Sequence, residues 1–169
     1  AHHFEYLINQ LKNKPEQFRA KVSRGKYWGK EVQEMKFDAI VGNPPYQIIN
    51  KGNGTGADPI YHLFMDAANS ICNRVCFIHP ARFLFNAGKT PKEWNLKMLN
   101  DEHFKVINYW ADSMELFPSV DVKGGIAVTL RDATCSFEKI GLFTPHREVK
   151  TILNKVLNCA SFEPIANLV

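Results

Sequence analysis

A short peptide in the first third of the sequence combines residue types that suit a planar amine. Asn43-Pro44-Pro45-Tyr46 follows directly on the mostly apolar run of residues 37–42. Both prolines restrict the backbone and lack an N–H group, so the peptide is stiff and its carbonyl oxygens meet few local donors. The Asn43 side chain and the Pro44 carbonyl are then acceptors, and Tyr46 adds a flat aromatic face. An amino group on a planar ring, as in adenine, fits two acceptors beside a stacking surface.

Hydrogen bonds accepted from such an amine would raise the nucleophilicity of its nitrogen toward a reactive methyl donor. The run FDAIVGNPPYQ, residues 37–47, resembles the catalytic motif of amino-methyltransferases, specifically the adenine-specific DNA methyltransferases of bacterial restriction-modification systems. Three later runs resemble the same family in the same order, namely PIYHLFMDAAN, VCFIHPARFL and ELFPSVDVKGGIAVTL. The resemblance extends over roughly residues 37 to 132.

The resemblance implies that an adenine leaves the DNA duplex and enters a pocket. Asn43 and Pro44 would accept hydrogen bonds from its amine, with Pro45 in the same catalytic motif, and Tyr46 would stack on the ring. Phe117 matches the aromatic residue that stacks on the other face of the base in this family. Packing beneath a turn is the alternative for Phe117. S-adenosylmethionine would donate the methyl group, and double-stranded DNA would be the substrate.

The glycine-rich cofactor motif of this family is missing from the residues ahead of the first predicted strand. That motif is a strand followed by Phe-x-Gly-x-Gly, whereas Gly25 and Gly29 lie in a basic connector with no strand before them. We therefore expect no S-adenosylmethionine site on this segment. The chain is interpreted as the base-binding half of a larger enzyme, inactive alone, whose partners include the missing cofactor-binding and target-recognition parts.

Predicted strands and helices alternate along the chain and would position the motif. Apolar runs predict strands at 37–42, 75–80, 104–110, 126–130 and 139–143, and helical spacing predicts helices within 4–22, 60–71, 90–100 and 146–158. Asp58-Pro59 has the residue types of a helix start, and the last helix should close the core. The pattern predicts an α/β protein, part of a Rossmann-like methyltransferase fold with a mostly parallel sheet flanked by helices. Residues 1–36 would form a helical segment and basic connector, and residues 37–169 the base-binding half-domain.

Other residues with possible chemistry are fewer. Lys123, Lys51 and Lys26 are candidate DNA contacts, although a solvated surface position is the commoner fate of a lysine. His62 and His79 have no partner at metal-binding spacing, so packing or surface roles are expected and no metal site is predicted. The net charge of +4 permits a nucleic-acid partner without requiring one. No apolar run is long enough to cross a membrane, and the four cysteines lack paired spacing, so a cytoplasmic protein with reduced thiols is expected.

Two other functions remain open from the sequence. Asn-Pro-Pro-Tyr also occurs in methyltransferases that modify glutamine side chains of proteins, and in some RNA methyltransferases. A non-catalytic module could bind DNA or a partner chain through the same pocket. The run ELFPSVDVKGGIAVTL and the Gly/Asn-rich stretch after Tyr46 favour DNA methylation, and Gly124 and Gly125 are expected to form a tight turn.

Overall fold

The computed structural model describes residues 2–23, 37–49 and 56–163. Lys26 and Lys51, two of the predicted DNA contacts, lie outside these ranges. The chain begins with helices α1 (His2–Asn13) and α2 (Pro15–Ser23), which contact α3 (Tyr61–Ile71). None of the helices in the described ranges is long and apolar enough to span a bilayer. All four cysteines are free.

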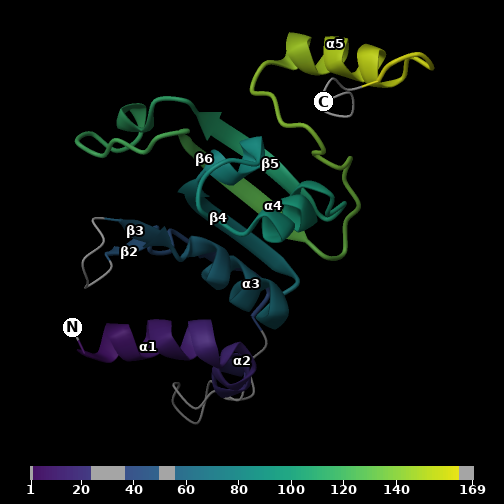
Figure 1. Ribbon diagram of the computed structural model, residues 1–169. Helices are drawn as coiled ribbons and strands as arrows, with labels where there is room; N and C mark the ends of the chain where they lie inside the picture. Colours follow the sequence, from purple (N-terminus) through teal and green to yellow (C-terminus); the bar gives the residue numbers. More distant parts are fainter. Residues whose placement is uncertain (1, 24–36, 50–55, 164–169) are drawn as a thin grey trace.

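Four strands form one mixed sheet in the order β1-β4-β6-β5. β1 (Ile40–Gly42) runs parallel to β4 (Arg74–Pro80), whereas β6 (Ile126–Asp132) runs antiparallel to both β4 and β5 (Phe104–Trp110). The prediction of a mostly parallel sheet is therefore wrong. β5 and β6 are joined by a turn-rich segment and not by a helical crossover, so they pair antiparallel. β1, β4 and β5 nevertheless point the same way, because β6 is inserted in reverse between β4 and β5. Figure 1 shows β4, β6 and β5 side by side.

Two short strands precede α3 where the sequence predicted a helix start. β2 (Gln47–Ile49) and β3 (Ala57–Pro59) pair antiparallel, with Gln47 opposite Pro59. Asp58-Pro59 is thus part of a strand, and α3 follows an Ile60 N-cap that makes no side-chain capping bond. The strand predicted at 139–143 is also wrong, because those residues form bends and coil. Tertiary pairing in the hairpin outweighs the local capping preference of Asp58.

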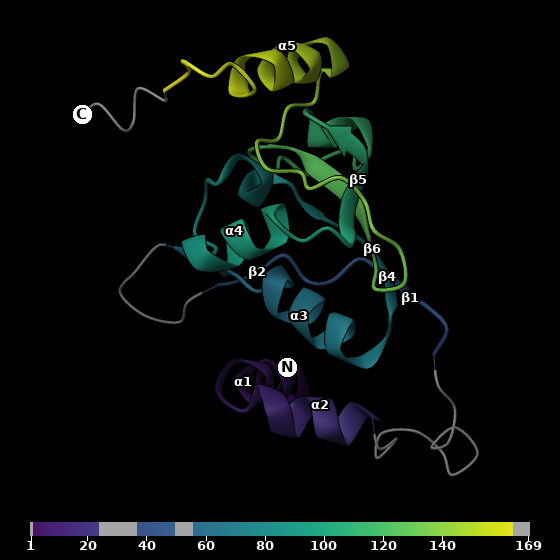
Figure 2. The ribbon, with the colours of Figure 1, turned by 90° about the vertical axis from the view of Figure 1, so that its right-hand side faces the viewer.

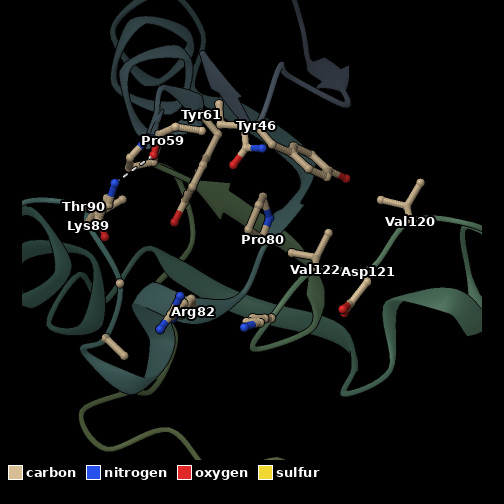
Figure 3. Close-up of a pocket in the computed structure, with 15 residues that line it drawn as sticks. Tyr46, Pro59, Tyr61, Pro80, Arg82, Lys89, Thr90, Val120, Asp121 and Val122 are labelled. Carbon is tan, nitrogen blue, oxygen red and sulfur yellow. Dashed lines mark hydrogen bonds between the residues drawn. The ribbon is translucent and has the colours of Figure 1, made fainter. Parts of the chain in front are cut away.

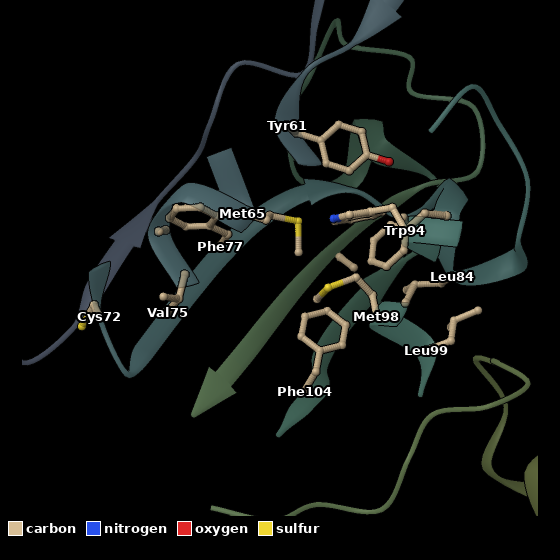
Figure 4. Packing of buried hydrophobic residues seen from close by; sticks show 14 residues of the cluster. Tyr61, Met65, Cys72, Val75, Phe77, Leu84, Trp94, Met98, Leu99 and Phe104 are labelled. Carbon is tan, nitrogen blue, oxygen red and sulfur yellow. The ribbon is translucent and has the colours of Figure 1, made fainter. Parts of the chain in front are cut away.

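The core fills the space between the sheet, α3, α4 (Lys92–Leu99) and the short 3₁₀ helix η2 (Arg82–Phe85) (Figures 2 and 4). Phe83 is fully buried, and its ring centroid lies 5.0 Å from that of Trp94 and 6.3 Å from that of Phe104. Burying a side chain of this size contributes roughly 1.5–3 kcal/mol, so this aromatic cluster joins η2, α4 and β5 into one unit.

His79 on β4 is part of this core, so of the two predicted alternatives, a packing or a surface role, it has the packing role. It is fully buried, and its ring stacks on Tyr61 with 5.6 Å between centroids and 4° between planes. Nε2 lies 2.7 Å from the Thr129 hydroxyl and Nδ1 lies 3.1 Å from the Pro80 carbonyl oxygen. A carbonyl can only accept, so Nδ1 carries the proton and Nε2 accepts from Thr129. The neutral imidazole is therefore fully hydrogen-bonded.

The last helix, α5 (Arg147–Leu157), lies apart from the sheet (Figure 1). Most of its apolar side chains are between 40% and 61% exposed, namely Val149, Ile152, Val156 and Leu157. The prediction that this helix closes the core is therefore wrong. An amphipathic pattern shows that a helix has an apolar face, but it does not identify the surface that covers that face.

The buried imidazole predicts a specific loss of stability in mild acid. Burial lowers the pKa of His79 from 6.5 to about 4. As the pH falls, the His79 imidazole is protonated in the unfolded chain before it is protonated in the folded one. The free energy of unfolding therefore decreases between pH 6.5 and about 4. Urea denaturation of the wild type should show a loss of about 2 kcal/mol from this group between about pH 7.5 and pH 5.

The matched variant is the double substitution His79→Phe with Thr129→Val, which keeps an aromatic ring against Tyr61 and leaves no orphaned hydroxyl. All other titrating groups are common to both proteins, so the difference between the two pH profiles isolates His79. If the unfolding free energies of the two proteins changed equally with pH, His79 would not be buried as a neutral imidazole.

Candidate functional site

The strand directions bring three separate segments to one end of the sheet. The carboxyl ends of β1 and β4 lie beside the amino end of β6, because β6 is antiparallel to β4. A cavity of about 470 Å³ lies at this end, lined by Tyr46 after β1, Pro80 and Arg82 at the end of β4, and residues 120–123 before β6 (Figure 3). Its volume is in the range of ordinary small-molecule sites. Two of the predicted site residues, Tyr46 and Lys123, thus meet at one cavity.

One backbone acceptor in the peptide before Tyr46, the Pro44 carbonyl, has no hydrogen-bond donor among the described residues. The Tyr46 carbonyl accepts a hydrogen bond from the Ile60 N–H at 3.1 Å, which ties the end of the motif to the start of α3. The Pro44 carbonyl accepts no hydrogen bond from any described residue. Asn43 and Pro45 are exposed and Pro44 is buried, and these three lie next to the cavity without lining it. The Pro44 carbonyl therefore stays without a described donor close in the chain to Tyr46.

Tyr46 itself is half-buried and its ring faces the cavity (Figure 3). The hydroxyl oxygen is buried and makes no regular hydrogen bond to any described residue. Burial raises the pKa of Tyr46, and the nearby Asn43 side chain acts against that rise by a smaller amount. The phenol is therefore neutral near pH 7, and the group available to a ligand is its ring.

A single serine fixes the wall of the cavity that residues 120–122 form. Ser113 is buried, and its hydroxyl donates to the Val120 carbonyl at 2.6 Å and accepts from the Val122 N–H at 2.8 Å. One hydroxyl therefore satisfies two backbone groups of the wall and fixes residues 120–122 relative to the 3₁₀ helix η3 (Ser113–Glu115). Ser113 was not predicted as a site residue, because nothing in the order of residues indicates this contact.

Phe117 lies near this wall but does not line the cavity. It is half-buried, its N–H donates to the Ser113 carbonyl at 2.9 Å, and its own carbonyl accepts from Val120 at 3.0 Å. These bonds build the turn that leads to the cavity wall. Stacking of Phe117 on a base remains a prediction. Lys123, a predicted DNA contact, lines the cavity and is exposed.

The turn before β6 requires glycine, as predicted. Gly124 and Gly125 have φ values of +89° and +77°, in the left-handed region that other residues adopt at a cost. A Cβ atom on Gly125 would overlap the Trp110 carbonyl oxygen, and the Gly125 carbonyl accepts from the Ala81 N–H at 3.0 Å. The turn therefore packs directly against the ends of both β4 and β5.

Tyr61 also lines the cavity and joins it to the core. Its ring stacks on the buried His79, and burial raises the pKa of Tyr61 to about 12, with Thr90 and the charge of Arg82 acting in the opposite direction. Sequence reasoning missed both Tyr61 and Arg82 as site residues. Arg82 lies two residues after the end of β4, so the rule that located Asn43 to Tyr46 after β1 could have found it.

The described residues include neither a cluster of metal ligands nor the glycine-rich turn that this family uses to bind its cofactor. No group of three or more His, Cys, Asp or Glu side chains that could hold a metal ion occurs in the described ranges. The described residues ahead of β1 form two helices and contain no glycine-rich turn after a strand. We therefore assign no described residue to S-adenosylmethionine.

Comparisons with known proteins match the chain to one family and to one curated relative. Residues 1–117 match the profile of the Eco57I restriction-modification methylase family. A curated protein of Mycoplasma pneumoniae, an uncharacterized adenine-specific methylase, is 36% identical over 95 residues, which cover 54% of this chain and 22% of that protein. The chain thus corresponds to less than a quarter of the length of that relative. No solved structure matches the chain significantly.

The tight turn predicts a large difference between two glycine substitutions. Gly125→Ala should destabilise the protein by at least about 3 kcal/mol, because the new methyl group collides with the Trp110 carbonyl and the residue keeps a positive φ. Gly141→Ala is the matched control, since Gly141 has φ +56° but nothing within 4 Å of the new Cβ. It should cost only about 1–2 kcal/mol. Equal costs in urea denaturation would contradict the close approach of the turn to β5.

Proposed function

Since this chain belongs to the Eco57I restriction-modification methylase family, we propose that it is the adenine-binding part of a DNA adenine methyltransferase. The reaction would transfer a methyl group from S-adenosylmethionine to the exocyclic amine of an adenine that has left the duplex. The single observation that supports this most directly is the Asn-Pro-Pro-Tyr peptide at the end of β1, with Tyr46 facing a cavity. Cytoplasmic DNA would be the substrate in the cell.

The chemistry that we propose for these residues is binding and polarisation. The Asn43 side-chain oxygen and the Pro44 carbonyl would each accept one hydrogen bond from the adenine amine. Two such bonds direct the amine hydrogens and leave the nitrogen lone pair less delocalised into the ring, which makes the nitrogen a better nucleophile. The unused Pro44 carbonyl supports this role, because no described residue competes for it.

Tyr46 would hold the adenine by stacking. Base–aromatic stacking is worth about 1–3 kcal/mol per base, which offsets part of the few kcal/mol needed to unstack the base from the duplex. The wall at residues 120–123 would limit the space on the other side of the cavity. S-adenosylmethionine, the methyl donor that the family implies, would be held by parts outside the described residues. Pairing with those parts would produce the active enzyme.

A direct comparison of substrates tests this proposal. An enzyme that combines this chain with its cofactor-binding part should transfer labelled methyl groups to duplex DNA, and digestion of the product should release N6-methyladenine. RNA and a release-factor-like protein serve as parallel substrates. Label in protein glutamine or in RNA, with none in DNA, would contradict the proposal. It would indicate a glutamine methyltransferase or an RNA methyltransferase instead.

Asn43→Ala tests the amine contact in the same enzyme. Loss of one hydrogen bond at a reacting group should lower kcat by about a hundredfold or more, while S-adenosylmethionine affinity measured by calorimetry stays unchanged. Asp38→Asn is the matched control, because Asp38 is exposed just before β1 and we assign it no part in the amine contact. Wild-type turnover in Asn43→Ala would exclude the proposed contact.

Tyr46→Phe and Tyr46→Ala separate the ring from the hydroxyl. The hydroxyl makes no regular hydrogen bond within the described chain, so Tyr46→Phe should retain turnover within a few fold. Tyr46→Ala removes the stacking surface and should weaken the binding of an extruded adenine about tenfold or more, as a raised KM for DNA. A similar loss in both variants would point to a role for the hydroxyl instead.

A further inference from the structure

We propose that Arg82 binds a phosphate group of the nucleotide whose base enters the Tyr46 cavity. This inference rests on the proposed function for the adenine, but it concerns a different residue and a different part of the ligand. Arg82 lines the same cavity as Tyr46, and the close-up view places the two on opposite sides of it (Figure 3). A nucleotide has a flat base at one end and an anion at the other, which matches an aromatic ring facing a guanidinium.

The stem of Arg82 is held by two glycine turns. A Cβ atom added to Gly88 would lie 3.2 Å from the Arg82 Cδ atom, and one added to Gly124 would lie 3.1 Å from its Cγ atom. Both glycines have positive φ, at +88° and +89°. The backbone therefore approaches the side chain so closely that only glycine fits well at either position. Arg82 is exposed, and backbone close to its stem on two sides would limit its rotamers before any ligand binds, which would lower the entropy cost of binding.

The guanidinium has no partner among the described residues. Other arginines of the sheet are paired: Arg74 contacts Asp132 at 2.8 Å, and Arg131 contacts Asp101 at 2.7 Å. Asp121 also lines the cavity, but it forms no ion pair with Arg82 within 4.0 Å. Arg82 is thus a positioned cation whose five N–H donors remain available, and a guanidinium fork matches the geometry of a phosphate.

The surroundings of Arg82 favour an anion. Lys89 and Lys123 line the same cavity, so three cations face one carboxylate there. Lys89 is partly occupied, since its Nζ atom donates to the Ala57 carbonyl at 3.2 Å and lies 3.9 Å from the Asp58 carboxylate. The charge of Arg82 also acts on the buried Tyr61, lowering its pKa against the rise caused by burial. Its field therefore reaches the floor of the cavity, and the excess positive charge is suited to a phosphodiester.

Binding of small ligands to the 169-residue chain tests this inference. The probes are 2′-deoxyadenosine, its 5′- and 3′-monophosphates, and inorganic phosphate, each titrated at low salt and followed by NMR chemical shifts. At least one monophosphate should bind about fivefold to tenfold more tightly than the nucleoside, because a charge-assisted hydrogen bond at a partly exposed site lies near the low end of its usual range. The preference should shrink as salt is added.

Arg82→Gln should abolish the preference for the monophosphate while leaving the affinity for the nucleoside unchanged. Arg82→Lys, which keeps the charge but loses the fork, should retain part of the preference. Lys97→Gln is the control for a lost charge, because Lys97 is exposed on α4 outside the cavity and pairs with Asp66. Circular dichroism confirms that each variant is folded. An unchanged ratio in Arg82→Gln, or no monophosphate preference in the wild type, overturns the inference.

The same titrations separate this inference from the proposed function. Asn43→Ala should weaken binding of the nucleoside without changing the ratio between monophosphate and nucleoside. If the nucleoside does not bind but phosphate binds in an Arg82-dependent way, the adenine site fails and the phosphate site stands. If the nucleoside binds and Arg82→Gln has no effect on the ratio, the adenine site stands and the phosphate site fails.

Discussion

The reversed direction of β6 is the constraint on which the rest of the structure depends. β6 pairs along its whole length with β4 and on its other side with β5. Because it enters the sheet at the end where β1 and β4 leave it, the segments around Tyr46, Arg82 and Val120 are brought to one place although they are far apart in the chain. A parallel β6 would start at the opposite end of the sheet, and no shared cavity would form from these three segments.

The cavity is rigid on one side because its floor is part of the core. Tyr61 faces the cavity and stacks on His79, whose two ring nitrogens are both hydrogen-bonded inside the sheet. The wall at residues 120–122 has no such packing and depends instead on the Ser113 hydroxyl and on the glycine turn. Local stability therefore differs across the site, with a floor that moves only if the sheet opens and a wall held by a few hydrogen bonds.

Sequence patterns predicted the elements of this fold better than their arrangement. The strand at 104–110 has the predicted bounds, and those of α3 and β4 agree within one residue, because apolar runs and helical spacing report local burial. Strand direction, the β2–β3 hairpin and the exposure of α5 depend on partners distant in the chain, which a periodic pattern does not identify. Tyr46 was placed at a site because its motif is contiguous. Ser113 was missed, since its role comes only from contacts with residues 120 and 122. Arg82 was also missed, although its place just after β4 is one that the rule used for β1 could have found.

The unpaired polar groups near the cavity have a common physical meaning. Buried acceptors and charges in a folded protein are normally satisfied, as Asp132 is by Arg74 and Thr134. Around Tyr46, by contrast, the Pro44 carbonyl and the buried Tyr46 hydroxyl lack a regular partner among the described residues, and the exposed Arg82 guanidinium makes no ion pair with any of them. Two prolines remove local donors at one of these positions, and two glycines hold the cation at another. Polar groups without a protein partner beside a cavity are the arrangement expected where a ligand supplies the partners.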